Sequence, residues 1–278
     1  INYQLGSEVL ATPSFSPGSI PAGIFVGTWS PHNWYHWIID ILPSVFHTRQ
    51  LPNAFRDYPL LIPEPALKNP AWLEPLELVR HGREIVALPP EKYVSVDHLI
   101  WVDSPTSPGP LPINRTRNGN FRIHGTAMRA YRDHIVSELR IPGGPPTRKL
   151  FLARRQNGNR PYNQDELLRV AATFGYEPVY LDKLNFRESV KVMSEALCIV
   201  GPHGAGWANA LFCSPSTRVF LWTWAEAKQD NWFANICSVG GLDYRVALSA
   251  QLNEDKSRVH FAKEDFILAL QELEASIG

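Results

Sequence analysis

Short apolar runs alternate with amphipathic segments through the second half of the chain, and this pattern constrains the fold more than any other feature. Short apolar runs are typical of buried strands, whereas apolar residues spaced three and four apart are typical of helices. Strands are predicted at residues 149–153, 177–181, 197–200, 217–222 and 244–247, and helices at residues 163–174, 186–196, 232–239 and 263–275. The alternation predicts an α/β fold in which helices cover both faces of a parallel sheet.

The first half is less regular, but it predicts a second α/β domain. Its strands are predicted at residues 23–27, 58–62, 85–88 and 94–102, its helix at residues 34–49 with a kink near Pro43, and mostly loop in the proline-dense residues 59–75. Proline and glycine fill most of residues 141–147, just after an amphipathic helix at residues 126–140, so neither helix nor strand can cross that segment. We therefore expect one domain at residues 1–140, a linker at 141–147 and a second domain at 148–278.

Charge and cysteine content restrict the partners of the chain. Its 27 Lys and Arg residues balance its 27 Asp and Glu residues, whereas a nucleic-acid-binding protein needs a strongly basic surface. No apolar run approaches the ~20 residues of a membrane-spanning helix. Cys198, Cys213 and Cys237 follow no metal-binding spacing and indicate a reducing compartment. We therefore expect neither a nucleic-acid partner nor a membrane span.

The strand predicted at residues 197–200 runs directly into a glycine-rich turn, residues 201–206, which an apolar helix start follows. The first backbone amides of a helix lack partners within the helix and carry partial positive charge. Gly204 and Gly206 remove side chains that would keep a phosphate from those amides, and His203 adds a donor. The turn therefore predicts a diphosphate site, although Asn209 stands where a dinucleotide fingerprint has its third glycine. The alternative is a tight turn without a ligand.

Further ligand candidates follow two other strands of the same predicted sheet. The carboxyl ends of parallel strands meet at one edge, where ligands bind, and Arg154 stands at such an end with a side chain that can fork onto phosphate oxygens. Its alternative is a surface ion pair with Asp165 or Glu166. Asn163 is also expected to cap the next helix. The strand at 217–222 and the residues after it add candidate contacts to a base or sugar, Trp222 and Trp224, for which core packing is the alternative. Glu226 follows them as a reserve candidate for the base.

His36 and Asp40 lie four residues apart in an aromatic-rich segment. On a helix this spacing places both residues on one face. A carboxylate beside an imidazole fixes its tautomer, which suits a general base that removes a hydroxyl proton. The alternative is that His36 packs or caps at the start of the helix while Asp40 makes a pair with solvent. A metal site is not expected here, because the sequence nearby does not indicate the third ligand that such a site would need.

Three ordered blocks together resemble glycosyltransferase family 61, which includes plant xylan xylosyl- and arabinosyltransferases and animal O-linked N-acetylglucosaminyltransferases. The first block is Asn33-Trp34-Tyr35-His36-Trp37-Ile38-Ile39-Asp40-Ile41-Leu42-Pro43. The second is Ala153-Arg154 with Arg160-Pro161-Tyr162-Asn163 and Glu166, and the third is Val200 to Asn209. The resemblance covers roughly residues 23–244. Two departures are Asp40, where the family often has Glu, and the strand at 219–222, which lacks the acid that usually ends it.

The resemblance implies a GT-B-like fold, in which two Rossmann-type domains face each other across a cleft. It implies an inverting glycosyltransferase of polysaccharide biosynthesis, with a nucleoside diphosphate sugar as donor, expected to be UDP-linked, and a glycan hydroxyl as acceptor. The catalytic residues would be His36 and Asp40. The residues that bind the donor would be Arg154, Arg160, Asn163, His203, Gly204, Ala205, Gly206 and Asn209.

No cofactor is expected, and the chain lacks an Asp-x-Asp triplet that would hold a metal ion. The alternative function is a catalytically inactive member of the family that binds a nucleotide or glycan within an assembly. An NAD-dependent oxidoreductase is disfavoured by the glycine spacing. We expect a cytoplasmic location for a bacterial member, or the lumen of the secretory pathway for a eukaryotic one.

Overall fold

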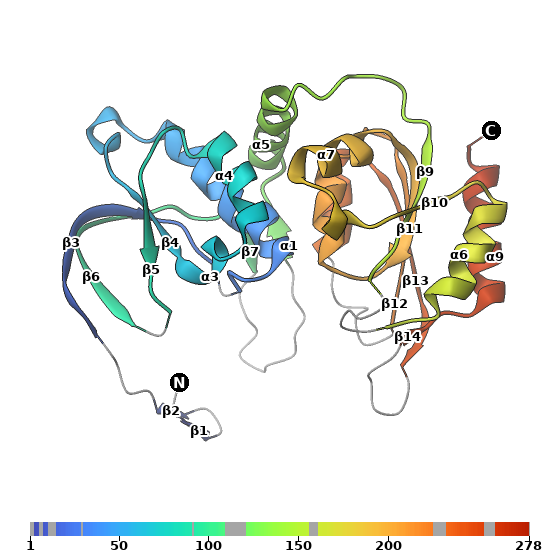
Figure 1. Ribbon diagram of the computed structural model, residues 1–278, viewed down its shortest axis with the longest axis horizontal. Helices are drawn as coiled ribbons and strands as arrows, with labels where there is room; N and C mark the ends of the chain where they lie inside the picture. Colours follow the sequence, from blue (N-terminus) through green and yellow to red (C-terminus); the bar gives the residue numbers. More distant parts are fainter. Residues whose placement is uncertain are drawn as a thin grey trace. The chain divides into compact units, whose positions relative to one another are not determined.

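The computed structural model describes residues 3–5, 8–10, 15–28, 30–90, 92–108, 121–155, 161–224, 232–252 and 259–277. The chain divides into two compact units, Ile1–Ser104 and Pro105–Gly278. Helices and strands alternate in both units (Figure 1). No helix in the described ranges combines the length and the apolar character that crossing a membrane requires.

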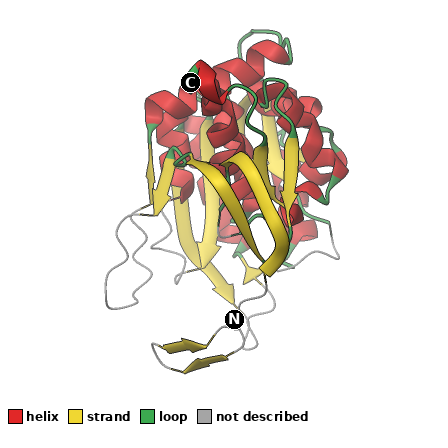
Figure 2. Cartoon of the chain, turned by 90° about the vertical axis from the view of Figure 1, so that its left-hand side faces the viewer, coloured by secondary structure: helices red, strands yellow, loops and turns green. Residues whose placement is uncertain are grey.

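The first unit is built on a parallel sheet of four strands. The strands are β3 (Phe15–Phe25), β4 (Leu60–Pro63), β5 (Ile85–Leu88) and β6 (Tyr93–Trp101), in the order β5-β4-β3-β6. All three pairings are parallel, and the long strands β3 and β6 curve together (Figure 2). Counted along the chain the order is 3-2-1-4, as in the first four strands of a dinucleotide-binding sheet. A separate antiparallel pair joins β1 (Tyr3–Leu5) to β2 (Glu8–Leu10).

A continuous helical segment follows β3, as predicted, but it changes its winding. Its parts are α1 (Trp34–His36), a π-helical turn η1 (Trp37–Ile41), α2 (Leu42–His47) and a 3₁₀ turn η2 (Thr48–Gln50). The prediction of a loop at residues 59–75 is wrong, since the region beyond β4 holds short helices. These are α3 (Glu64–Leu67), η4 (Pro70–Trp72) and α4 (Leu73–Val79), and η3 (Asn53–Phe55) precedes them. Prolines stand in the first turns of α3 and η4, where a missing N–H costs the helix no hydrogen bond.

Arg83 ties down the chain between η2 and β4. Its buried guanidinium donates to the carbonyl oxygens of Phe55 (2.6 Å), Arg56 (2.8 Å) and Tyr58 (3.1 Å). A fourth hydrogen bond reaches the carbonyl of Thr48 at 3.3 Å. One cation thus links the carbonyl of Thr48 in η2 to carbonyl groups of η3 and of the segment that leads to β4.

Replacing Arg83 with leucine is expected to lower the free energy of unfolding by about 1–3 kcal/mol, because the hydrogen bonds that this buried charged group donates to four main-chain carbonyls are lost. Urea denaturation of the wild type and the variant measures the difference. Lys68→Met is the matched control, since Lys68 makes an exposed ion pair with Glu64 and such pairs contribute little. Equal, small losses in the two variants would contradict the role given to Arg83.

The second unit is built on a larger, almost wholly parallel sheet. Its strands are β9 (Arg148–Leu152), β10 (Glu177–Val179), β11 (Ala196–Pro202), β12 (Arg218–Trp224), β13 (Asp243–Leu252) and β14 (Val259–His260). The order is β10-β9-β11-β12-β13-β14, and β14 alone among these is antiparallel to its neighbour. Apart from β14 the order is 2-1-3-4-5, that of doubly wound flavodoxin-like sheets. In this order, the strands after β9 are added first on one side of it and then on the other, so the strand order reverses between β9 and β11.

Helices pack on both faces of this sheet, which confirms the predicted parallel α/β architecture. The described helical elements of the second unit are α5 (Gly125–Glu138), α6 (Gln164–Thr173), η5 (Leu181–Lys183), α7 (Phe186–Ser194), η6 (Ala205–Phe212), α8 (Trp232–Gly240) and α9 (Lys263–Ala275). In Figure 1, α6 and α9 lie on one face and α7 on the other. Buried residues of β9, β12, α6 and α9, among them Phe151, Trp222, Leu167 and Phe266, form one apolar core. The strands β7 (Thr106–Pro108) and β8 (Phe121–Ile123) pair antiparallel.

The two compact units divide earlier in the chain than the predicted boundary at residues 141–147. That segment carries neither helix nor strand, as expected. The division falls at Ser104 and Pro105, because helix α5 packs on η6 and α8 of the second unit. Tyr131 of α5 is fully buried, and its ring lies 6.5 Å from that of Phe212. The proline-rich segment is therefore a loop, and the packing of α5 places that helix in the second unit.

Candidate functional site

His36 and Asp40 form a buried hydrogen-bonded pair in the first unit. Asn33 caps α1 by accepting a hydrogen bond from the Tyr35 amide at 2.9 Å, which begins the helix just before His36. The His36 Nδ1 atom lies 2.6 Å from Oδ2 of Asp40, and the two residues are 0% and 5% exposed. The predicted sharing of one helical face is therefore confirmed. Asp40 does not form the solvent-exposed pair of the alternative interpretation.

The helix is wound more widely at this pair than an α-helix. In the π-helical turn, the N–H of Leu42 donates to the carbonyl of Trp37. Pro43 follows directly and has no N–H to offer the preceding turn. The hydroxyl of Ser44 donates to the Asp40 carbonyl at 2.7 Å. Single π-helical turns occur often at functional sites, and this one carries Asp40 in its middle.

Asp40 is held from both strands that meet where the chain order of the first sheet reverses. Thr28, just after β3, places its Oγ1 atom 3.2 Å from Oδ2 of Asp40. Ser104, just after β6, places its hydroxyl 3.4 Å from the Asp40 carbonyl. The carboxyl ends of strands at such a reversal are the usual ligand edge of open α/β sheets. The pair therefore lies where the fold of this unit alone predicts a site.

The carboxylate of Asp40 determines which nitrogen of His36 is basic. An Nδ1–H donated to the carboxylate leaves the lone pair of the ring on Nε2. The ring of Tyr35 lies edge-on, 5.3 Å from that of His36. Burial, and secondarily the charge of Asp40, raise the pKa of the Tyr35 phenol well above its ordinary value, so Tyr35 stays neutral beside the pair. The arrangement can accept a proton at Nε2 while Asp40 stabilises the resulting imidazolium.

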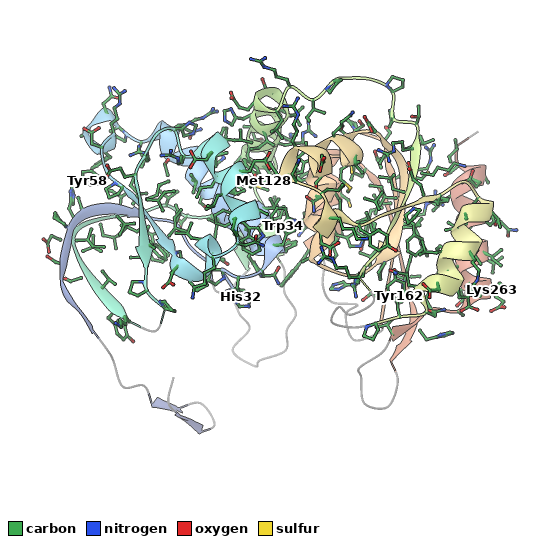
Figure 3. The ribbon with its side chains drawn as sticks, viewed as in Figure 1. His32, Trp34, Tyr58, Met128, Tyr162 and Lys263 are labelled. Carbon is green, nitrogen blue, oxygen red and sulfur yellow. The ribbon has the colours of Figure 1, made fainter. Side chains whose placement is uncertain are left out.

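The aromatic residues around His36 pack against one another. Trp37 is fully buried, and its ring is stacked on that of Trp72 at 5.6 Å. Trp34, at the start of α1 (Figure 3), lies 5.7 Å from the same ring. These side chains stabilise the position of the helix that carries His36 and Asp40.

A second group of predicted residues comes together at the carboxyl edge of the sheet in the second unit. Arg154 follows β9, while His203 and Gly204 follow β11, and β9 and β11 are the neighbours at which the strand order reverses. The Nη2 atom of Arg154 donates to the carbonyl of His203. A Cβ atom on Gly204 would lie 2.6 Å from the same Nη2 atom. Gly204 therefore leaves the space that the guanidinium occupies.

The glycines of this turn serve different purposes. A Cβ atom on Gly201 would lie 2.9 Å from Cβ and 3.3 Å from the carbonyl oxygen of Leu152, so Gly201 is needed where β11 packs against β9. Gly204 is extended, with φ 174°, and a Cβ atom on Gly206 would make an ordinary contact at 3.5 Å. Neither has the left-handed backbone that a tight turn reserves for glycine. Helix η6 begins at Ala205, so its first amides directly follow Gly204, the residue that the guanidinium of Arg154 approaches.

Two predicted contacts to the donor are placed differently. Asn163 stands at the N-cap of α6 but makes no capping hydrogen bond; its carboxamide instead bonds both to the N–H (3.1 Å) and to the carbonyl (3.0 Å) of Phe261. Asn209 is 1% exposed inside η6, and its Nδ2 atom donates to the Gly206 carbonyl at 2.9 Å. Both side chains hold main-chain segments near the edge of the sheet through these hydrogen bonds.

Trp222 belongs to the core, which corrects its prediction as a contact to a base or sugar. It is 1% exposed and stacked on Phe261 at 5.3 Å, since its position in β12 points it toward α6 and α9. The imidazole of His203 packs edge-on against Phe233 at 5.0 Å. The backbone of Trp224 ends β12, but its side chain lies outside the described part. Arg160 and Glu226 also lie outside the described residues.

No sequence pattern singles out Gln164, although it contacts the predicted site directly. Gln164 is 7% exposed, and its side chain accepts from the main-chain N–H of Arg154 and donates to the main-chain carbonyl of the same residue. A buried glutamine at the start of a helix looks like any surface polar residue in the sequence. Only its adjacency to Asn163 in the second sequence block points toward it. Within the described ranges, no three His, Cys, Asp or Glu side chains are grouped so that they could hold a metal ion.

Comparison with known proteins identifies the family of the chain. Residues 34–220 match the family described as Glycosyltransferase 61. The match spans more than half of the chain and contains His36, Asp40, Arg154 and the turn at Gly204. A search of curated proteins found no match. The extent of the family match shows that the chain belongs to glycosyltransferase family 61.

Proposed function

We propose that the protein is an inverting glycosyltransferase that moves a sugar from a UDP-linked donor to a hydroxyl of a glycan acceptor in polysaccharide biosynthesis. The observation that carries the proposal is the meeting of Arg154 and the Gly204 turn at the β9–β11 edge. Doubly wound sheets bind nucleotides at this reversal of strand order. A GT-B-like pairing of two Rossmann-type domains is part of the same proposal.

The diphosphate would be bound by the second unit. The amides of Ala205 and Gly206 begin η6 and point partial positive charge toward an anion. The guanidinium of Arg154 would exchange the His203 carbonyl for a phosphate oxygen, and a hydrogen bond to a charged acceptor is about twice as strong as one to a neutral acceptor. Arg160 and His203 would add to the positive field. Such fixed charges would stabilise the diphosphate as it leaves the sugar.

The proton of the acceptor would be taken by His36. As its Nε2 atom removes the hydroxyl proton, the acceptor oxygen would form a bond to the anomeric carbon while the bond from that carbon to the phosphate oxygen breaks. Attack from the face opposite the leaving UDP inverts the anomeric configuration. Asp40 would stabilise the imidazolium through the 2.6 Å contact to Nδ1. Because His36 has no exposed surface, the surrounding side chains must move when an acceptor binds.

A panel of UDP-sugars tests the proposal. We expect one of them to be hydrolysed slowly to UDP and free sugar without an acceptor, and the ¹H NMR signal of the first product to show the inverted anomer. Retention of configuration would contradict the inverting mechanism. UDP binding without any turnover would instead identify an inactive family member that binds a nucleotide. Failure to bind any nucleotide would contradict the donor site.

Transfer is expected to continue in excess EDTA. The sequence holds no Asp-x-Asp triplet, and the proposed mechanism assigns the neutralisation of the diphosphate to Arg154 and the helix amides. Turnover measured before and after chelation checks this, with a metal-dependent glycosyltransferase as positive control for the chelator. Activity lost in EDTA and restored by manganese or magnesium would contradict it.

A further inference from the structure

The side chain of Gln164 makes two hydrogen bonds to the main chain of Arg154, as a neighbouring strand would. The main-chain N–H of Arg154 donates to Oε1 of Gln164 at 2.7 Å. The Nε2 atom of Gln164 donates to the main-chain carbonyl of Arg154 at 2.9 Å. Strand β9 has ended at Leu152, so one primary amide completes the two hydrogen bonds that a β-ladder would otherwise supply. Arg154 is thereby held in line with the strand that leads to it.

The two hydrogen bonds between the Gln164 side chain and the main chain of Arg154, here called the clamp, require a glutamine. A carboxamide has both a donor and an acceptor, whereas a carboxylate has only acceptors and an apolar side chain has neither. The fixed N–H and C=O of Arg154 also determine which end of the amide is oxygen. Asparagine is one methylene shorter, and at the preceding position Asn163 makes the same two-sided contact with Phe261. Two successive carboxamides thus hold two different segments of main chain at the edge of the sheet.

The clamp is anchored in the core. The hydroxyl of Tyr162 donates to Oε1 of Gln164 at 2.7 Å, and the Tyr162 ring packs edge-on against Trp222 at 6.1 Å. Tyr162 lies beside the start of α6 in Figure 3. Burial raises the pKa of the Tyr162 phenol above its ordinary value, so it remains a proton donor. Oε1 therefore accepts from Tyr162, whose ring packs in the core, as well as from Arg154, so Gln164 ties the main chain of Arg154 to the core.

We propose that Gln164 is a positioning residue of the donor site: by holding the main chain of Arg154, it sets where the guanidinium meets the diphosphate. The proposal rests on the diphosphate-binding role of Arg154 given above. Gln164 grips the main chain of Arg154 while the guanidinium reaches the His203 carbonyl. Its effect on the ligand is therefore exerted through another residue. Donor affinity should depend on Gln164 only while Arg154 is present.

Titration calorimetry with UDP as the probe tests this on the full chain. Gln164→Met keeps the length of the side chain but removes both hydrogen bonds, and we expect UDP affinity to fall by about ten- to a hundredfold, the scale of a small misplacement of a binding group. Thr217→Val is the matched control. Thr217 is buried as well, and its hydroxyl proton is shared between the carbonyls of Ala196 (2.7 Å) and Ser214 (2.8 Å), but at the amino end of β12, away from the ligand edge. It should lower the melting temperature without changing UDP affinity.

The readout that separates positioning from mere stability is a double-mutant cycle. In an Arg154→Ala background, Gln164→Met should cost no further affinity, because there is no guanidinium left to place. If Gln164→Met does not fold, Gln164→Glu takes its place in the cycle. The Glu variant keeps the acceptor and lacks the donor until it is protonated, so its loss of affinity relative to wild type should shrink as the pH is lowered.

The outcomes are distinguishable. If the wild type binds UDP and Arg154→Ala weakens binding, but the Gln164 variants bind as the wild type does, this proposal alone is overturned. The same holds if Gln164→Met costs an equal factor with and without Arg154, since its effect would then not pass through that residue. If the wild type binds no UDP, or Arg154→Ala binds it normally, the donor site itself is overturned and this proposal with it.

Discussion

Replacing His36 with alanine is expected to reduce turnover by about a hundredfold to ten-thousandfold, the usual contribution of a general base. The acceptor hydroxyl then lacks the imidazole that is proposed to receive its proton. UDP affinity should change little, because the proposed diphosphate site is built from residues of the second unit. Steady-state kinetics with the best donor, together with titration of UDP, measure both quantities.

Two further variants sharpen this result. Asp40→Asn should give a smaller loss, since it disturbs the orientation and charge support of His36 but leaves the imidazole in place. His98→Ala is the matched control, because His98 lies on β6 of the same unit and bonds to Tyr58 at the surface. A His36 variant with full turnover would refute the assignment. If Glu226→Gln were inactive at the same time, the role of the base would pass to Glu226.

Replacing Arg154 with alanine is expected to weaken UDP binding by about 1.5–3 kcal/mol, the range for hydrogen bonds to charged groups. This corresponds to roughly a ten- to 150-fold rise in Kd. Gly204→Ala should lose much of the same affinity, because its new methyl group would stand 2.6 Å from the place that Nη2 of Arg154 occupies without UDP and would crowd the guanidinium beside the proposed phosphate site. The fold should tolerate it, since the displaced atom is the far end of a flexible side chain. Titration calorimetry measures all affinities.

The Arg154→Ala/Gly204→Ala double variant decides whether the two residues act together. If Gly204 serves Arg154, the double variant should bind UDP about as weakly as Arg154→Ala, and the losses should not add. Gly143→Ala controls for the substitution itself, because a Cβ atom there meets nothing within 4 Å. Fully additive losses would mean that Gly204 contacts the ligand independently of Arg154. Normal binding by both single variants would move the phosphate site elsewhere.

The sequence predicts those parts of the fold that depend on local periodicity. The strands β9 and β11 and the helices α6 and α9 have apolar patterns that only one kind of element satisfies, and the structure places them within a few residues of the prediction. The contact between His36 and Asp40 is also local, because four residues along a helix fix their separation. The prolines between β4 and α4 misled the prediction, since a proline at a helix start reads like a proline in a loop.

The rest of the candidate site depends on partners that are distant in the chain. Asn163 is engaged by Phe261, 98 residues away, and Trp222 is covered by α9, which leaves Trp222 no surface for a ligand. Gln164 contacts a main chain ten residues earlier, just beyond the end of β9. The place of Gly204 is explained by a guanidinium rather than by a strained turn. Each of these relations exists only once the sheet has formed.

The most direct test of the proposed donor site is a crystal structure of the protein with UDP bound. We predict that the diphosphate lies at the β9–β11 edge, with phosphate oxygens about 2.7–3.2 Å from the amides of Ala205 and Gly206 and from the guanidinium of Arg154. Arg154 should then have left the His203 carbonyl that it contacts here. UDP bound with its phosphates away from this edge, while Arg154 keeps its contact to His203, would contradict the account.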